Sequence, residues 1–208
     1  MKKFVAILFS TLFLNGVAHA GWGVSFMTGI LSSEGTETEN SGSRESEVNT
    51  NDLHEAFYGA SLYYEAEVNG ITYGVDYVPL KLEIGSGSRS DTTSDGNETT
   101  SDTGSYSAEA NVEHLTTVYA NIPTGAGGWY GVLGVHYAEI TSDESLPNST
   151  YGDEKVFGAQ VGFGLKQDNL KYELSYSDFE DISLNSTSGS SSVEADADAL
   201  TLKISYGF

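Results

Sequence analysis

The strongest constraint on the fold is an alternation of apolar with small or polar side chains that repeats every two residues. The last ten residues, "ALTLKISYGF", show it clearly: Leu200, Leu202 and Ile204 share one parity, and Thr201 and Lys203 share the other. Successive side chains of a β-strand point to opposite faces, whereas a helix would repeat its apolar residues every three to four positions. The sequence therefore predicts an all-β protein whose strands each have one apolar and one polar face.

Eight segments carry this pattern. The third is irregular, because its apolar parity switches at Pro79. Proline cannot donate to a strand ladder, and an extra residue shifts the alternation, so we expect a bulge there. The predicted strands are 21–31, 55–68, 71–84, 106–122, 129–141, 154–166, 169–180 and 197–208.

The connections between these strands alternate between short and long. Asn69-Gly70, "PTGAGG" and "QDN" are short turn sequences. The other connections are long and rich in Ser, Thr, Asp and Glu, and they cover 32–54, 85–105, 142–153 and 181–196. In an antiparallel up-and-down barrel all the short turns fall at one end. That asymmetry is typical of transmembrane β-barrels, with short periplasmic turns and long extracellular loops.

The positions of the aromatic residues indicate whether the apolar faces contact lipid or form the core of a soluble protein. On the apolar parity they gather near both ends of the strands, as two membrane interfaces favour. A secreted soluble barrel of the lipocalin type, with its apolar faces inside, remains the alternative. The net charge of -21 disfavours nucleic acid as a partner, and the absence of cysteine excludes disulfides and thiolate chemistry.

The first twenty residues have the features of a secretory signal peptide. Lys2 and Lys3 precede an apolar stretch, and Ala18-His19-Ala20 fits a cleavage site. We therefore expect a cleaved segment at 1–20 and a barrel domain at 21–208.

The C-terminal strand resembles the assembly signal of Gram-negative outer-membrane barrels, through Leu200, Leu202, Ile204, Tyr206 and the terminal Phe208. With eight predicted strands, the chain is similar to the small barrels of the opacity-protein and outer-membrane-protein-A group. This resemblance implies residence in the bacterial outer membrane, recognition by the barrel-assembly machinery, and lipopolysaccharide as the surrounding lipid.

The polar parity of the strands carries charges that a closed barrel would place inside. An eight-stranded barrel is filled by its own side chains, so we expect a plugged lumen. Lys203 is expected to pair with Glu173 across the last two strands. The predicted ionic cluster is Asp76, Glu113, Glu173, Lys171 and Lys203, and the wider inward set adds Glu55, Glu65, Glu67, Glu109, Lys81 and Lys166.

Enzymatic and metal sites receive little support from the sequence. His114 and Thr116 share the apolar parity but have no orienting carboxylate on that face. Residues 91–102 offer hard oxygen ligands without the spacing of a calcium loop, which leaves only weak binding of divalent cations. We therefore expect no catalytic residue, cofactor or metal centre.

The leading hypothesis for function is a monomeric, non-enzymatic outer-membrane barrel that presents acidic loops for envelope integrity, adhesion or surface interaction. Two alternatives stay open. An acid-rich lumen would suit a narrow cation-preferring channel, and His114 leaves room for a lipid A-modifying enzyme.

Overall fold

The computed structural model describes residues 19–39, 47–91, 104–145, 151–186 and 191–208. No helix in these ranges is long and apolar enough to cross a membrane. The regular elements are strands: β1 (His19–Glu39), β2 (Glu47–Val68), β3 (Ile71–Tyr77), β4 (Leu82–Asp91), β5 (Gly104–Pro123), β6 (Trp129–Glu144), β7 (Glu154–Gln167), β8 (Leu170–Phe179), β9 (Ile182–Asn185) and β10 (Ser191–Gly207).

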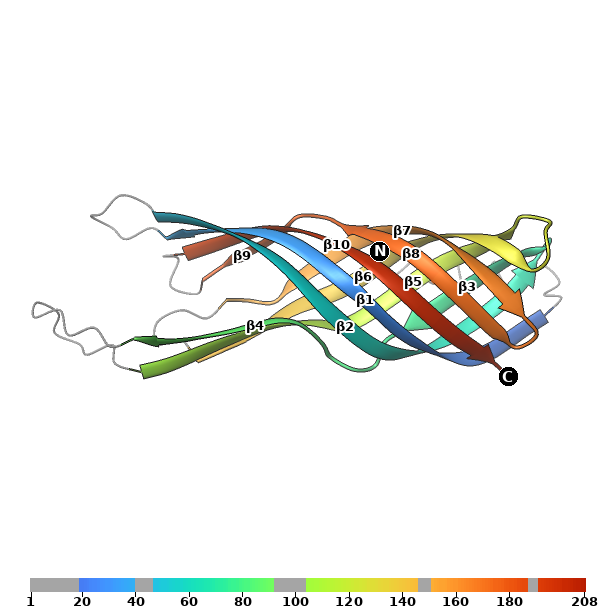
Figure 1. Cartoon of the computed structure of the whole chain (residues 1–208), viewed down its shortest axis with the longest axis horizontal. Coiled ribbons are helices and arrows are strands. Elements are labelled where there is room, and N and C mark those ends of the chain that lie inside the picture. Colours follow the sequence, from blue (N-terminus) through green and yellow to red (C-terminus); the bar gives the residue numbers. More distant parts are fainter. Residues whose placement is uncertain (1–18, 40–46, 92–103, 146–150, 187–190) are drawn as a thin grey trace, which may run out of the picture.

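The strands close into a ring (Figure 1). Neighbours pair antiparallel in the order β1-β2-β3-β5-β6-β7-β8-β10, and β10 pairs with β1 from Gly23↔Gly207 to Glu39↔Ser191. β4 continues the position of β3, and β9 continues that of β8, so the ten strands occupy eight positions. In the part of the ring up to Leu62↔Tyr77, closure pairs the described strands on both sides, as backbone in hydrocarbon requires. The predicted eight-stranded antiparallel barrel is confirmed.

The irregularity in the third strand is a break, so the predicted bulge at Pro79 is wrong. β3 ends at Tyr77 and β4 begins at Leu82, and between them the Val78 N–H donates to the Leu115 carbonyl at 2.9 Å. Pro79 lies in this interruption, where the ladder needs no donor. Register shifts occur on either side of it: in β5 between Glu113 and Thr116, where His114 has a φ of 54°, and in β4 between Glu83 and Gly85.

β1, β2, β4 and β10 extend well beyond the predicted limits at the end that carries the long connections, which we call the loop end. β1 and β2 have 21 and 22 residues and stay paired up to Glu39↔Glu47. A membrane crossing needs only about 9 to 11 residues. Segments predicted as loops are thus partly sheet, because paired strands satisfy their backbone groups whatever their side-chain polarity.

At the loop end the wall divides into two sheets, here called blades. The first blade contains β9, β10, β1 and β2, and the second contains β4, β5 and β6. The β2–β3 ladder ends at Leu62↔Tyr77, and beyond it the described residues of β2 and β4 form no ladder. Figure 1 shows the two blades diverging away from the C-terminus.

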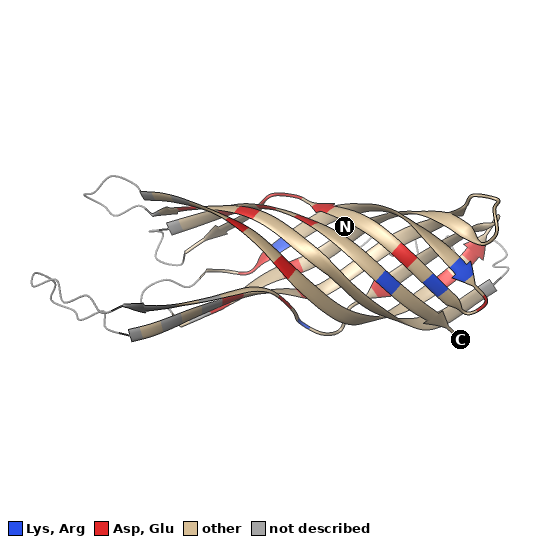
Figure 2. Cartoon of the chain, in the orientation of Figure 1, with Lys and Arg blue, Asp and Glu red and all other residues tan. Residues whose placement is uncertain are grey.

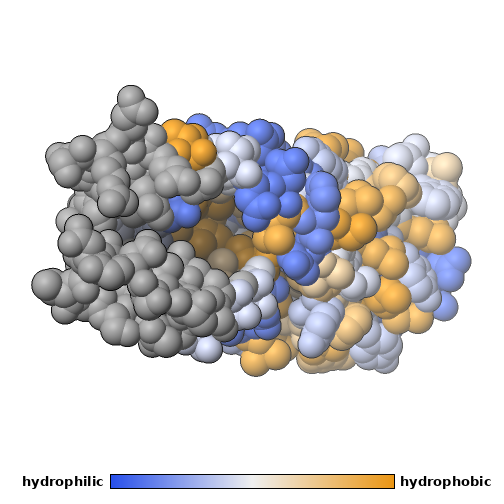
Figure 3. All heavy atoms as spheres, turned by 60° about the vertical axis from the view of Figure 1, so that its left-hand side comes forward, coloured by the Kyte–Doolittle hydropathy of each residue, from blue (hydrophilic) through white to orange (hydrophobic). Residues whose placement is uncertain are grey.

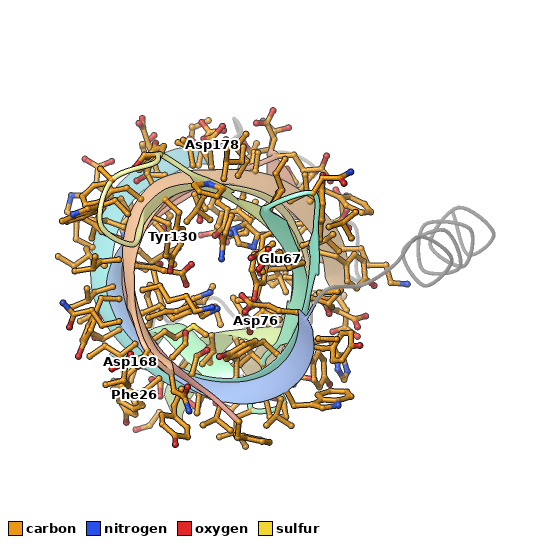
Figure 4. The ribbon with its side chains drawn as sticks, turned by 90° about the vertical axis from the view of Figure 1, so that its right-hand side faces the viewer. Phe26, Glu67, Asp76, Tyr130, Asp168 and Asp178 are labelled. Atoms are coloured by element: carbon orange, nitrogen blue, oxygen red, sulfur yellow. The ribbon has the colours of Figure 1, made fainter. Side chains whose placement is uncertain are left out.

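Apolar side chains cover the outside of the ring. Leu200, Leu202, Ile204 and Tyr206 are 42 to 48% exposed on one face of β10. In Figure 4 Phe26 points away from the ring, whereas Asp76 and Tyr130 point into it. Aromatic pairs lie near both edges of the apolar wall, with Trp22 by Tyr64 at the short-turn end and Tyr137 by Phe157 toward the loop end. This arrangement excludes the soluble-barrel alternative, whose apolar faces would point inward.

Candidate functional site

A group of charged side chains from four strands crosses the lumen, in the half nearer the C-terminus (Figure 2). Lys203 of β10 lies between two carboxylates, with its Nζ 3.0 Å from Glu173 Oε2 and 3.4 Å from Asp76 Oδ2. These side chains are 14%, 3% and 5% exposed, respectively. An ammonium shared by two buried carboxylates ties β3, β8 and β10 together across the interior.

A second ion pair lies beside the first. The Lys171 ammonium donates to Glu65 Oε1, which also accepts from Tyr119 OH at 2.8 Å. Lys171 Nζ is 4.2 Å from the centroid of the Tyr63 ring, and Lys203 Nζ is 5.1 Å from that of Tyr119. We call the residues Glu65, Asp76, Lys171, Glu173 and Lys203, with Tyr63, Tyr119 and Tyr130, the plug cluster.

The three tyrosines occupy space that glycines leave free on neighbouring strands. A Cβ at Gly23 would lie 2.2 Å from the Tyr63 ring, and one at Gly74 would lie 2.3 Å from the Tyr119 ring. Gly164 has the same relation to Tyr130, at 2.4 Å. The inward glycines therefore serve close packing at these positions, and the rings fill the lumen around the ion pairs.

The structure brings together four of the five residues predicted for the ionic cluster. Lys203 lies within ion-pair distance of Glu173, and Asp76 and Lys171 belong to the same group. Glu65, which the predicted cluster omitted, is the partner of Lys171.

Glu113 does not lie in the lumen, so its predicted place there is wrong. It pairs in register with Glu139, while its neighbour Val112 pairs with the interior residue Ile140. The β5 bulge reverses the phase of the strand, and Glu113 consequently points outward and accepts from Thr141 Oγ1 at 3.4 Å. Lys81 and Glu109, also predicted to face inward, form an exposed ion pair at 3.7 Å.

Above the plug cluster the lumen contains a polar layer and then an apolar chamber. His136 bonds Thr117 Oγ1 through Nδ1 at 2.8 Å and Ser177 Oγ through Nε2 at 2.9 Å, and its ring stacks on Phe179. His136 thus belongs to the polar network of the interior. Toward the loop end follow two buried apolar clusters, made of Met27, Val78 and Leu82, and of Ala138, Ile140, Val156 and Ile182.

His114 lies on the outside, at the bulge. Its Nδ1 is 3.1 Å from Tyr77 OH, and the Thr116 hydroxyl donates to the His114 backbone carbonyl at 3.0 Å. Nucleophile activation requires a hydrogen bond between the hydroxyl and the imidazole. Here the Thr116 hydroxyl bonds to the backbone carbonyl instead.

Several sequence predictions concern residues outside the described ranges. These are the signal segment up to residue 18 and almost all of the acidic stretch 91–102. Within the described residues, no group of three or more His, Asp or Glu side chains is arranged to hold a metal ion.

The first blade has an acidic outer face directly beyond the apolar wall. Along β10 the outward residues change from Leu202 and Leu200 to Asp198 and Asp196. Glu34 of β1 pairs in register with Asp196 on one side and with Asp52 of β2 on the other. A further opposed pair is Asp178↔Asp198, and Asp178 points outward in Figure 4. We call Glu34, Asp52, Asp178, Asp181, Asp196 and Asp198 the acidic face.

Two charged groups beyond the apolar wall have shifted proton affinities. A hydrogen bond shared with Asp181 raises the pKa of Asp196, and the nearby Glu34 adds to the shift. On the second blade, a hydrogen bond to Asp143 raises the pKa of Lys81. The acidic face thus contains carboxylates close enough to share a proton.

Comparison with known proteins gives fold-level likeness. No protein-family model matches the sequence, and no curated protein sequence matches it. Among solved structures, it is similar to the outer membrane protein OprG from Pseudomonas aeruginosa, at 10% identity over 93% of this chain and 99% of that one, with a TM-score of 0.48. It is also similar to Ail, the attachment invasion locus protein of Yersinia pestis, in complex with the heparin analogue sucrose octasulfate. The identity is 13% over 89% of this chain and 99% of that one, with a TM-score of 0.40. The outer membrane protease OmpT from Escherichia coli is 10% identical over 90% of this chain and 97% of that one, with a TM-score of 0.41.

At these identities the assignment depends on the chain's own strand pairing and surface. A closed ring of eight strand positions has short turns at one end and long strands at the other. Its outer wall is apolar, with aromatic residues near both edges. These features are those of a small transmembrane β-barrel.

Proposed function

We propose that the protein is a non-enzymatic outer-membrane barrel with a closed lumen, which holds acidic β-sheet blades at the cell surface for interaction with polycationic partners. The observation that carries this proposal is the row Asp52, Glu34 and Asp196, in which like charges lie directly opposite one another on three adjacent strands. Directly opposed like charges destabilise a sheet. The same clustering of carboxylates creates a negative electrostatic potential, which attracts cationic protein segments or divalent cations.

The position of the acidic face supports a role at the membrane surface. It begins one outward residue beyond Leu200, so it lies at the level where lipid head groups are expected. Lipopolysaccharide is anionic and would repel it unless divalent cations bridge the two. Cation-bridged contact with lipopolysaccharide is therefore part of the proposal, together with assembly through the C-terminal strand and a monomeric state.

Binding to a cationic probe tests the proposal. The protein in lipid nanodiscs is titrated with hexalysine, and the affinity is measured by biolayer interferometry at low and at physiological salt. The double variant Glu34→Gln/Asp196→Asn should bind at least tenfold more weakly at low salt. Its control, Glu67→Gln/Asp168→Asn, removes the same charge at the short-turn end. Equal affinities of the two double variants would contradict the proposal.

A narrow cation channel is the second candidate. The plug cluster contains three carboxylates and two ammonium groups, so the lumen favours cations. A mouth of about 330 Å³ at the short-turn end reaches Tyr63, Glu65 and Lys171. Continuous packing around the ion pairs favours a closed lumen, and planar-bilayer recordings decide between the two. Discrete cation-selective currents from the wild-type barrel would support the channel, and their absence would support the closed barrel.

A further inference from the structure

The apolar chamber contains a partly open cavity of about 80 Å³ above the plug cluster. Val112 and Leu115 of β5 pack against both buried apolar clusters and join them into one lining. The floor of the cavity is polar and includes His136, Asp76 and Lys203. Neither the closed lumen nor the acidic face uses an apolar cavity at this place, so its role needs a separate explanation.

A groove at the seam between the two blades adjoins this cavity. It has a volume of about 360 Å³ and is lined by residues 55–58 of β2 and 81–86, mostly of β4. Three side chains, Phe57, Leu82 and Ile84, line both the groove and the cavity. The two hollows therefore meet at these apolar side chains, and Figure 3 shows apolar surface inside the hollow between the blades.

The seam is closed by side-chain packing. A Cβ at Gly59 would lie 2.8 Å from Leu82 Cδ2, and one at Gly85 would lie 3.0 Å from Leu53 Cδ2. No strand ladder joins β2 to β4 in the described part of the seam. Rotation of a leucine side chain costs far less than opening a row of backbone hydrogen bonds. A guest can thus pass between groove and cavity without unpairing strands.

The volumes limit the shape of that guest. An apolar cavity of about 150 Å³ accepts benzene, so a cavity of about 80 Å³ is too small for a ring. It can hold the end of a single aliphatic chain. The remaining chain and a polar head group would lie in the larger groove, whose lining combines Phe57 and Leu82 with Glu55 and Glu83.

The charges around the groove determine the head group. Its only cationic side chain, Lys81, is already paired with Asp143 and Glu109. Glu55 and Glu83 line the groove as carboxylates. We propose that groove and cavity form a binding site for a single-chain amphiphile with an ammonium head, whose chain end passes Phe57 into the cavity while its head stays near the two glutamates. This site is independent of the function proposed above.

Binding of a fluorinated chain tests the site. The protein in nanodiscs is titrated with 8,8,8-trifluorooctylammonium, and the ¹⁹F signal is compared with that in empty nanodiscs. Thr201→Leu enlarges a side chain that lines the cavity and should weaken saturable binding at least tenfold. Thr36→Leu makes the same change on the outer face of β1, at a residue that lines neither the groove nor the cavity, and should bind like the wild type. Heat-dependent gel mobility establishes that both variants fold.

Head-group specificity is tested with 8,8,8-trifluorooctanoate, which should bind at least tenfold more weakly than the amine. The variant Glu55→Gln/Glu83→Gln should remove most of this preference. Three results would overturn the proposal: no saturable signal above empty nanodiscs, unchanged binding in Thr201→Leu, or equal binding of amine and carboxylate to the wild type.

Discussion

Replacing Lys203 by methionine tests the plug cluster most directly. The change keeps an unbranched chain but removes the ammonium that lies 3.0 Å from Glu173 and 3.4 Å from Asp76. Glu173 and Asp76 are 3% and 5% exposed and are left without this counter-charge. Breaking a buried ion pair in this way costs about 3 to 5 kcal/mol.

The cost also has a limit set by protonation, because a stranded carboxylate can become neutral. Protonating a glutamate of ordinary pKa 4.3 costs about 3.7 kcal/mol at pH 7 and about 1 kcal/mol at pH 5, at about 1.36 kcal/mol per pH unit. In the variant the folded state then binds a proton that the unfolded state lacks, so lower pH favours folding. We expect Lys203→Met to lose about 3 to 4 kcal/mol at pH 7 and about 1 kcal/mol at pH 5, both relative to the wild type.

The assay is reversible urea unfolding of the barrel in lipid vesicles, followed by tryptophan fluorescence at both pH values. Lys166→Met changes an exposed lysine at the mouth of the lumen and should shift stability by no more than about 0.5 kcal/mol. Adding Asp76→Asn and Glu173→Gln to Lys203→Met should restore most of the loss, since it removes the stranded charges. The reasoning fails if Lys203→Met costs no more than Lys166→Met, or if its cost is the same at both pH values.

Three further predictions concern the outer wall, the acidic face and the C-terminus. Leu202→Arg places a charge on a side chain that is 47% exposed on the apolar wall and should cost about 2 to 4 kcal/mol near the membrane midplane. Thr72→Arg lies at the mouth of the lumen beside Glu65 and Glu67 and should cost less in the same urea assay. NMR titration should find the pKa of Asp196 above its ordinary value, and the stability that this shift contributes is lost as pH rises through that pKa. Asp181→Asn should lower the pKa of Asp196, and an unchanged pKa would refute the shared hydrogen bond. Deleting Phe208, which is 74% exposed and donates its N–H to the Trp22 carbonyl, should slow assembly into outer membranes in pulse-chase experiments while leaving refolding in detergent unchanged.

The pairing inside the membrane could be read from the sequence because its side-chain alternation is strict. Over residues 170–176 of β8 and 200–206 of β10 every second residue is apolar, so parity alone places Lys203 and Glu173 on the same inner face. The tight turns fix one end of each strand, which makes the register of neighbouring positions predictable. Glu65 lies on that face too, and its partner Lys171 is three strand positions away around the ring. Parity cannot report such contacts across the lumen.

The loop end was less predictable because polarity does not distinguish an exposed loop from an exposed strand. Residues 32–39 and 47–54 look like loop sequence, yet they pair as a ladder in water. The β5 bulge contains no glycine or proline. Its only sign in the sequence is Leu115, an apolar residue at a position where the alternation of the segment predicts a polar one. That single signal would have moved Glu113 to the outside.

The break around Pro79 accounts for the seam between the blades. β3 ends at Tyr77, and β4 resumes in register with β5 alone, so β2 beyond Leu62 keeps only its ladder to β1. The break between β8 and β9 differs, because there the Glu180 N–H donates to the Phe157 carbonyl and its carboxylate accepts from the Phe157 N–H. Further along, an isolated bridge between Tyr151 and Ser186 also joins the two sides. The contrast explains why the adjoining groove is lined by β2 and β4, and why an apolar guest would reach the chamber there.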